Sequence, residues 1–466
     1  MALHPRHPDQ PMTPSRRAFT RLAADVRAVR VLMATTGERA VIVSAPPGGG
    51  KSSLIRAIAR SLARPAGAVV PILSQTNDQA DDLVVHLHRE RPRLSIGRLH
   101  APRRLSPAVA ALAAVPGSRL HVSTDVDELL AAKTKVIVAP AAKWAHSTLS
   151  RQVEWAIVDE AYQMRADALY GIADLADRLL LVGDPGQLSP FTTLNTTRWV
   201  GLPHSPVRPA MCTLAATRPR LPVHSMAVSH RLPPSAATII SDALYPDTPF
   251  IAGTKPADRT LTLRQPPRRL GHQGLNLDAV LDLAAASGWA YAELPARHTR
   301  PDDPGLARLL GALVHRLLQR RPAVTSELPH EQQPRALRTA DIAVIVSHNS
   351  QADRVRTALA AAGVPAGVTV ATANRIQGRE CAVSFFWHPL SGRRDTSPFH
   401  IDPGRLAVGL TRHRHAVIVA SRAGLDDCLL ESADTDDLYL GEPEQRLDPI
   451  EVNWRILNHL MNHQAG

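Results

Sequence analysis

A glycine-rich stretch near the start of the chain has the residue types that hold a phosphate group. Residues 45–53 read Ala-Pro-Pro-Gly-Gly-Gly-Lys-Ser-Ser, between an apolar run at Ala40–Ser44 and helical spacing at Lys51–Leu62. Glycines let backbone N–H groups turn inward around a phosphate, while a lysine meets its oxygens and a serine hydroxyl binds Mg²⁺ at a helix N-terminus. The stretch therefore predicts a site for ATP and Mg²⁺, made by Pro47, Gly48, Gly49, Gly50, Lys51, Ser52 and Ser53.

Polar residues also follow two other apolar runs. The run Trp155–Asp159 leads into Glu160, and residues 179–183 lead into Asp184-Pro-Gly-Gln187. In a parallel sheet the carboxyl ends of the strands meet at one edge, where ligands bind. We expect Asp159 to hold Mg²⁺ through water and Glu160 to polarise the water that attacks the phosphate. A lysine, two carboxylates and a glutamine thus converge on one edge of a sheet.

Strand-like and helix-like segments alternate along the first 200 residues or so, and this alternation indicates the fold class. Apolar runs at 68–73 and 135–139 join the three named above, and helical spacing occurs at 79–89 and 161–175. Such an order favours an α/β fold in which a parallel sheet has helices on both faces.

A second alternating unit begins near residue 205. We expect its strands at 342–347, 368–372, 382–386 and 416–420, and a helix at 351–362. Residues 248–339 are rich in Pro and Arg and predict loops with one helix at 304–318. From Gly424 the chain is acidic and ends in a short helical segment.

Seven segments occur in the order of the motifs of superfamily 1 helicases, and the chain resembles the branch that contains the nonsense-mediated-decay helicase. Besides the phosphate-binding loop, the similar segments are 76–83 (motif Ia), Asp-Glu-Ala-Tyr-Gln at 159–163 (motif II), 183–188 (motif III), His-Arg-Leu at 230–232 (motif IV), Ile-Gln-Gly-Arg-Glu at 376–380 (motif V) and Val-Gly-Leu-Thr-Arg at 408–412 (motif VI). The resemblance implies two tandem RecA-like domains of the P-loop NTPase class.

The resemblance also implies roles for individual residues. Lys51, Glu160, Gln187, Arg231 and Arg412 would be catalytic: Gln187 would sense the γ-phosphate, and the two arginines would reach it from the second domain. His230 would stack on the base, and Gly378 and Glu380 would contact the nucleotide, Glu380 at the ribose. Thr76, Asn77 and Thr372 would touch a single strand of nucleic acid. Two guanidinium groups are chemically suited to a phosphoryl transition state because they neutralise its spreading charge.

These inferences divide the chain into four parts. We expect an N-terminal extension at 1–37, a RecA-like domain with the P-loop and motif II at 38–204, and a second RecA-like domain with motifs IV–VI at 205–425. The second domain would contain a Pro/Arg-rich insertion at about 250–338, and an acidic tail would occupy 426–466. The insertion or the tail is the expected place for a protein partner.

Composition limits the remaining choices. The net charge of +12 favours a polyanionic partner, but only five of the 54 basic residues are lysines, a bias that a GC-rich genome also produces. The arginines of 89–104 are candidates for lining a nucleic-acid groove, with a solvated loop as the alternative. Trp144 and Trp387 are candidates for stacking on bases, although core positions suit them better. Three cysteines, no long apolar run and a polar N-terminus predict a cytoplasmic protein without a membrane span.

Two functions remain open on the sequence. The first is an ATP-dependent helicase or translocase on single-stranded nucleic acid, DNA rather than RNA, with 5′–3′ polarity implied by the resemblance. The alternative is a nucleotide-switched ATPase that clamps nucleic acid or a protein without separating strands. A single-domain P-loop NTPase, such as a loader, would leave motifs V and VI unexplained.

Overall fold

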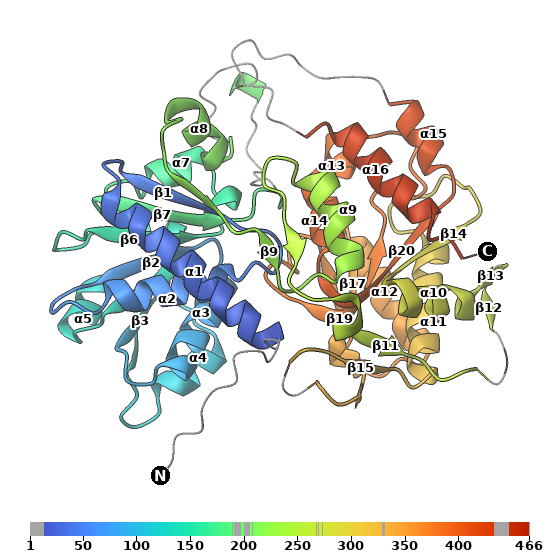
Figure 1. The fold of residues 1–466 in the computed structure, drawn as a ribbon, viewed down its shortest axis with the longest axis horizontal. Helices are drawn as coiled ribbons and strands as arrows, with labels where there is room; N and C mark the ends of the chain where they lie inside the picture. The colour runs from blue at the N-terminus through green and yellow to red at the C-terminus, as the bar shows by residue number, and fades with distance from the viewer. Residues whose placement is uncertain are drawn as a thin grey trace, which may run out of the picture.

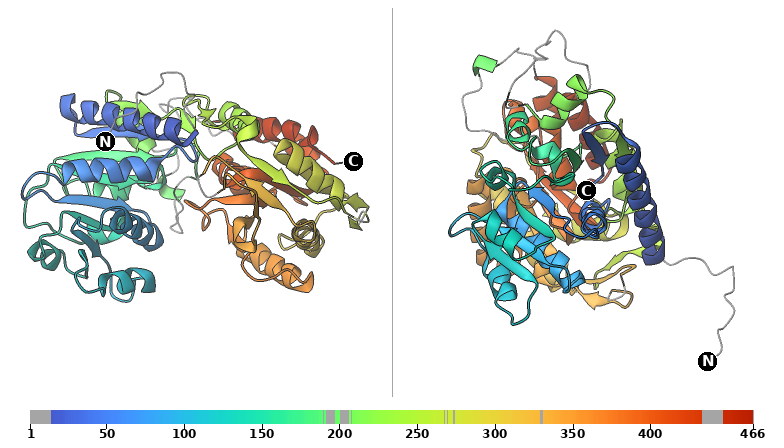
Figure 2. Two further views of the ribbon diagram at one scale, coloured as in Figure 1. Left: turned by 60° about the horizontal axis from the view of Figure 1, so that its bottom comes forward. Right: turned by 90° about the vertical axis from the view of Figure 1, so that its left-hand side faces the viewer.

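The protein folds into two α/β domains that lie side by side (Figure 1). The computed structural model describes residues 14–188, 190, 197–199, 206, 208–266, 268, 270–272, 274–328, 331–432 and 447–465. Each domain has a parallel sheet between two layers of helices, as the turned views show (Figure 2). The predicted fold of two RecA-like domains is confirmed. Among the described residues, none of the helices has the length and apolar character needed to cross a bilayer.

The first domain is built on an eight-stranded parallel sheet. Its strand order is β4-β3-β5-β2-β6-β7-β1-β8. The strands are β1 (Ala40–Ser44), β2 (Val70–Ser74), β3 (Ile96–Leu99), β4 (Leu120–Ser123), β5 (Val136–Pro140), β6 (Trp155–Asp159), β7 (Arg178–Gly183) and β8 (Val223–Ser225). Alternate residues of β1 face opposite cores: Val41 and Val43 pack on one side of the sheet, Ala40 and Ile42 on the other. Burial of both faces explains why these strands read as unbroken apolar runs.

Helices cover both faces of this sheet. They are α1 (Pro14–Thr35), α2 (Lys51–Leu62), α3 (Asn77–Glu90), α4 (Pro107–Ala113), α5 (Val126–Ala131), α6 (Ala141–Trp144), α7 (Ala166–Tyr170) and α8 (Ala210–Thr217), with short 3₁₀ turns η1 (Ala161–Gln163) and η2 (Thr197–Trp199). The helix predicted at 161–175 is wrong. Glu160 adopts a left-handed backbone with φ 54°, and Met164 is extended, so only η1 and the short α7 form.

The second domain has a five-stranded parallel sheet with the order β14-β20-β19-β17-β18. Its strands are β14 (Trp289–Leu294), β17 (Ile342–Val346), β18 (Thr369–Thr372), β19 (Cys381–Trp387) and β20 (His413–Arg422). Its helices are α9 (Pro234–Leu244), α10 (Leu277–Ser287), α11 (Pro304–Gln319), α12 (Asn349–Ala361), α13 (Pro398–Ile401), α14 (Pro403–Leu410), α15 (Leu425–Leu430) and α16 (Pro449–Met461). The four strands and two helices predicted here are all present, each within a few residues of its expected bounds.

Small sheets and turns join these layers. Strand β9 (Val228–Ser229) pairs with β10 (Ile251–Ala252), and β12 (Gly271–His272) pairs with β13 (Leu275–Asn276). A three-stranded sheet contains β11 (Thr260–Thr262), β15 (Ala323–Thr325) and β16 (Arg335–Ala336). The 3₁₀ turns η3 (Pro256–Asp258) and η4 (Thr339–Asp341) complete the connections.

The expected domain boundaries need correction at four places, three of them before the C-terminal segment. The boundary at 204 comes too early, because β8 pairs with β1 and so belongs to the first sheet. The segment 250–338 is not an insertion of loops with one helix, since its α10 and β14 are structural parts of the second domain and β14 pairs with β20 along its full length. The extension 1–37 is likewise part of the first domain in its described portion, because Val29 and Met33 of α1 are buried in that core.

The C-terminal segment 426–466 is also part of the second domain rather than a separate tail. Four residues of α16 are buried in the core beneath the sheet: Val452, Ile456, Leu457 and Leu460. The backbone N–H of Tyr291 in β14 donates to the His463 carbonyl at 2.8 Å. The acidic residues 433–446 lie outside the described part of the chain.

Candidate active site

The phosphate-binding loop joins β1 to α2 with the geometry that its glycines allow. Gly48 and Gly50 have φ of 71° and 91°, a left-handed backbone that residues with a Cβ avoid. Helix α2 begins at Lys51, so its free N–H groups face the loop. The Lys51 ammonium lies 3.5 Å from a carboxylate oxygen of Asp184, at the end of β7. The lysine is thus held at the edge of the sheet where a phosphate would lie.

The carboxylates of Asp159 and Glu160 stand at the end of the neighbouring strand β6. Burial, and then the Glu160 charge, raise the pKa of Asp159 to about 7, although Lys51 opposes the rise. Glu160 is only 7% exposed, and its Oε2 atom has no hydrogen-bond partner in the described part of the chain. A buried carboxylate oxygen without a donor, beside a second carboxylate, fits a divalent cation and its bound waters. Asp159 and the exposed Ser52 hydroxyl are the groups that would hold Mg²⁺ here.

Asp184 is fully buried and lies at the centre of a hydrogen-bond network. Its carboxylate accepts from the Gly186 N–H at 3.1 Å, from the Gln187 amide at 2.8 Å and from the Tyr245 hydroxyl at 2.8 Å. Gln163 in turn donates to the Gln187 side-chain oxygen at 3.0 Å. Tyr245 ends α9 of the second domain, so this network spans the two domains. The sequence did not predict the hydrogen bond between Asp184 and Tyr245, because no local residue pattern around either position indicates it.

The segment of motif IV lies directly against the phosphate-binding loop. The Ser229 hydroxyl donates to the Pro47 carbonyl at 2.6 Å, and the His230 N–H donates to the Gly48 carbonyl at 2.9 Å. A Cβ placed on Gly48 would come within 2.8 Å of the Arg231 backbone nitrogen. Glycine is therefore required at position 48 for a second reason, the close approach of the Arg231 backbone.

Arg231 and Glu380 face each other in the second domain. The Arg231 Nε–H donates to Glu380 at 3.2 Å, and a terminal N–H donates to the Thr411 carbonyl at 3.3 Å. Burial favours the neutral carboxyl of Glu380, but Arg231 and Arg414 outweigh it and hold the pKa of Glu380 below its usual value. The structure thus brings together residues of motifs IV, V and VI that are up to 180 positions apart.

Arg412 is the most unusual charge in the cleft. It is 1% exposed, its Nε–H donates to the Val408 carbonyl at 3.2 Å, and one terminal nitrogen has no partner among the described residues. Burial and the nearby Arg231 lower the pKa of Arg412 to about 10, against the attraction of Asp184 and Glu160. A buried guanidinium nitrogen without an acceptor is costly, and an anion in the cleft would satisfy it.

A pair of residues that we did not expect holds the Arg231 segment in place. Arg259 is 8% exposed and donates to the carbonyls of both His230, at 2.7 Å, and Arg231. Glu327 accepts from Arg259 through both carboxylate oxygens, at 2.8 and 2.5 Å. Since Arg259 and Glu327 are 68 positions apart, no local pattern reveals this clamp.

Comparisons with known proteins agree with this arrangement. Two family models, each described as an AAA domain, match residues 22–198 and 308–423, which contain the P-loop with motifs Ia–III and motifs V–VI, respectively. The chain is a superfamily 1 helicase-like protein. No curated protein matches it.

Solved structures similar to this helicase-like chain include two helicases and one NTPase. They are the PRRSV helicase (14% identity, 86% of this chain and 54% of that chain, TM-score 0.38), arterivirus nonstructural protein 10, a helicase, with DNA (13%, 87% and 63%, TM-score 0.41) and the E. coli DExH-box NTPase HrpB (14%, 89% and 42%, TM-score 0.37). The chain spans about two fifths to two thirds of the length of these proteins.

The residues expected to touch a nucleic-acid strand lie at the carboxyl edges of both sheets, and they stay predictions. Thr76 caps α3, where its hydroxyl accepts from the Gln79 N–H, and Asn77 accepts from Arg98 at 3.1 Å. Thr372 ends β18 and is buried. No described contact joins Thr372 to Thr76 or Asn77.

The remaining expected nucleotide-binding residues are Gly378, His230 and Ser53. Gly378 has φ 77° and open space beside it. Burial lowers the pKa of His230. Ser53 is half-buried and accepts from Arg56 at 3.0 Å.

Three residues considered for nucleic-acid contact are structural instead. Arg98, from the basic segment 89–104, is fully buried and donates to Asp81 at 2.6 Å. Trp144 is 2% exposed and its ring N–H donates to the Ile72 carbonyl at 3.2 Å, and Trp387 is 1% exposed. Each of the three large side chains is almost completely enclosed by the protein.

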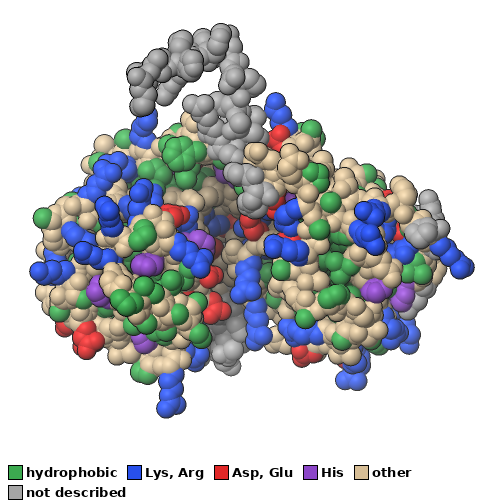
Figure 3. Space-filling model, turned by 90° about the horizontal axis from the view of Figure 1, so that it is seen from below, with side chains coloured by type: hydrophobic (Ala, Val, Ile, Leu, Met, Phe, Trp, Pro, Cys, Tyr) green, Lys and Arg blue, Asp and Glu red, His purple; other side chains and the backbone are tan. Residues whose placement is uncertain are grey.

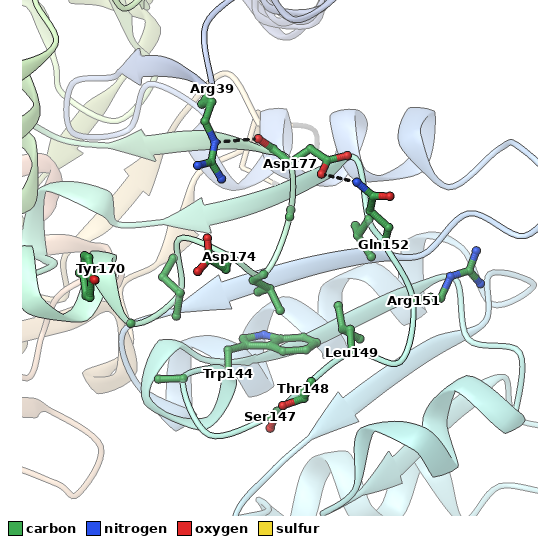
Figure 4. A pocket seen from close by; sticks show the side chains of 16 residues that line it. Arg39, Trp144, Ser147, Thr148, Leu149, Arg151, Gln152, Tyr170, Asp174 and Asp177 are labelled. Atoms are coloured by element: carbon green, nitrogen blue, oxygen red, sulfur yellow. Dashed lines mark hydrogen bonds between the residues drawn. The ribbon is translucent and has the colours of Figure 1, made fainter.

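The first domain also has a cavity of about 400 Å³, and Trp144 alone among the candidate residues lines it (Figure 4). It lies at the amino-terminal edge of the sheet, where Arg39 donates to the Asp177 carbonyl at 3.3 Å and Gln152 donates to the Asp177 carboxylate at 2.8 Å. Because the P-loop lies at the opposite edge, this cavity is separate from the candidate active site.

Proposed function

We propose that the chain hydrolyses ATP in the cleft between its domains and uses the cycle to step along single-stranded nucleic acid, DNA rather than RNA, from 5′ to 3′. The observation that carries the proposal is Arg412, a buried guanidinium with an unpaired nitrogen, held by the second domain and close enough to feel the charges of Asp184 and Glu160 in the first. The surface is hollowed between the domains, with charged side chains on both sides (Figure 3).

Each group has a role that follows from its position. The loop N–H groups and Lys51 bind the β- and γ-phosphates, and Asp159 and Ser52 would hold Mg²⁺, which would supply positive charge next to the phosphates. Glu160 accepts the proton of the attacking water, since its free oxygen has no other donor. Gln187 donates a hydrogen bond to Asp184, so a change in its position on contact with the γ-phosphate would alter the hydrogen bonds that include Tyr245. Arg231 and Arg412 neutralise the charge of the transferring phosphoryl group.

The coupling to movement follows from where the arginines are anchored. Arg231 and Arg412 belong to the second domain, whereas Lys51 and the carboxylates belong to the first. A γ-phosphate between them draws the domains together, and its loss removes that attraction. Closing and opening therefore alternate with hydrolysis, and a strand lying across Thr76, Asn77 and Thr372 would be gripped by each domain in turn.

The decisive experiment measures ATP hydrolysis with single-stranded DNA, with single-stranded RNA and with neither, at two salt concentrations. The proposal predicts stimulation by DNA that weakens with salt, because strand binding releases counterions. Lys51→Ala must lose hydrolysis in every arm, which excludes a contaminating ATPase. Displacement of a strand annealed beside a 5′ tail, but not a 3′ tail, tests polarity. Stimulation without displacement on either substrate would favour the nucleotide-switched clamp, and no response to any strand would contradict the proposal.

A further inference from the structure

A second charged cavity lies in the second domain, away from the nucleotide cleft. It has a volume of about 650 Å³ and is lined by the loop 295–305 that follows β14, with Arg308 of α11, Arg354 of α12 and Arg422 at the end of β20. We call it the β14 cavity. A smaller cavity of about 290 Å³ shares Arg297 and His298 with it and adds two arginines and two carboxylates: Arg393, Arg394, Asp427 and Glu431. Arginine is therefore the dominant charged residue on this surface.

The acidic residues of the β14 cavity do not neutralise its arginines. Asp303 is buried and accepts from Arg422 at 2.5 and 3.2 Å, while Asp302 accepts from Arg354 at 2.9 Å. The Arg354 hydrogen bond also holds the pKa of Asp302 below its usual value, so this carboxylate stays charged and paired. Both carboxylates are thus already matched by one arginine each.

The other three arginines of the cavity are not held in an ion pair, although the charge of Arg300 also acts on Asp302. Arg297, Arg300 and Arg308 are exposed, and none of them forms an ion pair with a described residue. Arginine presents a planar fork of N–H donors that matches two phosphate oxygens. Three such groups around one concave surface are suited to successive phosphates of a nucleic-acid backbone more than to a single small anion.

The position of the cavity relates it to the expected nucleic-acid path. Strand β14 is parallel to its neighbours, so the loop after it lies at the same carboxyl edge of the sheet as Thr372, which ends β18. The sheet order places four strand-to-strand steps between β14 and β18. At about 4.8 Å a step, the two places are roughly 19 Å apart. Phosphates of one DNA strand are spaced by at least about 3.4 Å, so roughly six or fewer would bridge this distance.

Side chains between the two places suit the same strand. His348, which follows β17, stacks on Phe399 with ring centroids 5.0 Å apart, and the guanidinium carbon of the buried Arg405 lies 3.7 Å from the centroid of the Phe399 ring. Phe399 is partly exposed. Partly exposed aromatic side chains along a basic edge are what single-strand grooves use, because bases stack on rings while the backbone follows the charges.

We propose that the β14 cavity binds the phosphodiester backbone of the strand beyond Thr372, which lengthens the nucleic-acid site over the second domain. This inference rests on the proposed function, because it needs a strand at Thr372. Arg297, Arg300 and Arg308 are the residues that contact phosphate, and Arg354 and Arg422 position the loop through Asp302 and Asp303.

The test compares strand-length dependence of binding in two triple variants. The first is Arg297→Ala/Arg300→Ala/Arg308→Ala. The control is Arg64→Ala/Arg119→Ala/Arg218→Ala, which removes the same charge from exposed arginines of the first domain that precede strands. Fluorescence anisotropy with labelled oligo-dT from about 4 to about 20 nucleotides brackets the site sizes of single modules. Basal ATP hydrolysis without DNA should be unchanged in both variants.

The cavity variant should bind long strands about tenfold more weakly than wild type, with short strands unaffected. Its salt slope on long strands should fall by about 2, since each lost phosphate contact contributes about 0.7. An equal loss on short and long strands, or an equal loss in the control, would overturn the inference. If wild type binds no strand of any length, the proposed function itself fails. If it binds normally and the cavity variant matches it, only this inference fails.

One further arm separates a strand site from a site for free phosphate. Inorganic phosphate is compared with chloride at the same ionic strength as a competitor of long strands. A backbone site predicts that phosphate competes better than chloride in wild type but not in the cavity variant, because the arginines that bind phosphodiester oxygens also bind a free phosphate. Such competition together with long-strand binding that is unchanged in the cavity variant would show that the cavity takes only a free anion, and would overturn the backbone assignment.

Discussion

Glu160 carries the clearest chemical signal at the scale of single residues. Its carboxylate is buried, has a free oxygen and stands on a left-handed backbone beside Asp159. Non-glycine residues in that conformation are rare and cluster at functional sites, because the backbone there costs energy that the surrounding structure must offset. The side chain is thereby directed away from the strand and toward the cleft.

The exchange Glu160→Gln should separate binding from hydrolysis. The amide keeps the shape of the carboxylate but cannot accept the proton of water, so turnover should fall about 100-fold or more while ATP affinity stays within a few-fold. Steady-state hydrolysis and binding of a fluorescent ATP analogue measure the two quantities. Turnover near that of wild type would place the base elsewhere.

The outcome at single positions shows what residue patterns reveal. The phosphate-binding loop was predictable, because glycines, a lysine and a serine between a strand and a helix have few other uses. Asp184 and Tyr245 were not, since their hydrogen bond joins positions 61 apart in different domains. Arg98 was predicted to be an exposed arginine because it lies in a basic stretch. The structure shows that it is buried and paired with Asp81.

At the scale of elements, the Arg259–Glu327 clamp assigns a role to the Pro/Arg-rich segment. Arg259 precedes β11 and Glu327 follows β15, and these strands pair with each other. The three-stranded sheet therefore carries the clamp to the carbonyls of His230 and Arg231. A segment that reads as loops thus contributes to the position of an arginine at the nucleotide cleft.

Loss of the clamp should impair hydrolysis without removing nucleotide binding. In Arg259→Ala the backbone at Arg231 loses two hydrogen bonds, and a displacement of about 1 Å is enough for a 100-fold loss. We expect kcat to fall roughly 10- to 100-fold with KM changed by a few-fold at most. Arg356→Ala, an exposed arginine of α12, is the control. A thermal unfolding curve checks that the Arg259→Ala protein is still folded at the assay temperature. A change in KM without a change in kcat would contradict the positioning role.

Helix α16 gives a test of the corrected C-terminal boundary. Leu460 is fully buried in the second domain, whereas the adjacent Met461 is 51% exposed. Leu460→Ala should lower the free energy of unfolding by about 2–5 kcal/mol through lost burial and a cavity. Met461→Ala should change it by about 0.5 kcal/mol or less. Equal effects in thermal or urea unfolding would mean that α16 does not belong to the core.

Periodicity explains which elements could be predicted. Strands β1 and β6 match their expected bounds because apolar residues fill both faces and polar residues end them. Strand β14 was missed because it lies within the Pro/Arg-rich segment that reads as loops, and only its pairing with β20 makes Trp289–Leu294 the edge strand of the second sheet. Long-range pairing of this kind leaves no local periodicity to read.

At the scale of the whole molecule, the account depends on two domains sharing one cleft. Ser229 and His230 are hydrogen-bonded to the carbonyls of Pro47 and Gly48, and Tyr245 to Asp184. These contacts bring Arg412 to a phosphate-binding loop more than 350 positions earlier in the chain. The family order of the motifs predicts that Arg412 lies near the phosphate-binding loop. The physical reason for this position is that the buried Arg412 guanidinium has one nitrogen without a partner among the described residues, which a bound phosphate would satisfy.

The most direct test of the central claim is the turnover of Arg412→Ala with saturating ATP and single-stranded DNA. The account predicts a fall of about 1,000-fold or more, as for loss of an arginine finger, with ATP affinity within a few-fold of wild type. Arg412→Lys should restore little, because an ammonium cannot replace the planar fork, and Arg356→Ala should hydrolyse normally. Turnover of Arg412→Ala within about threefold of wild type would contradict hydrolysis in a cleft completed by the second domain.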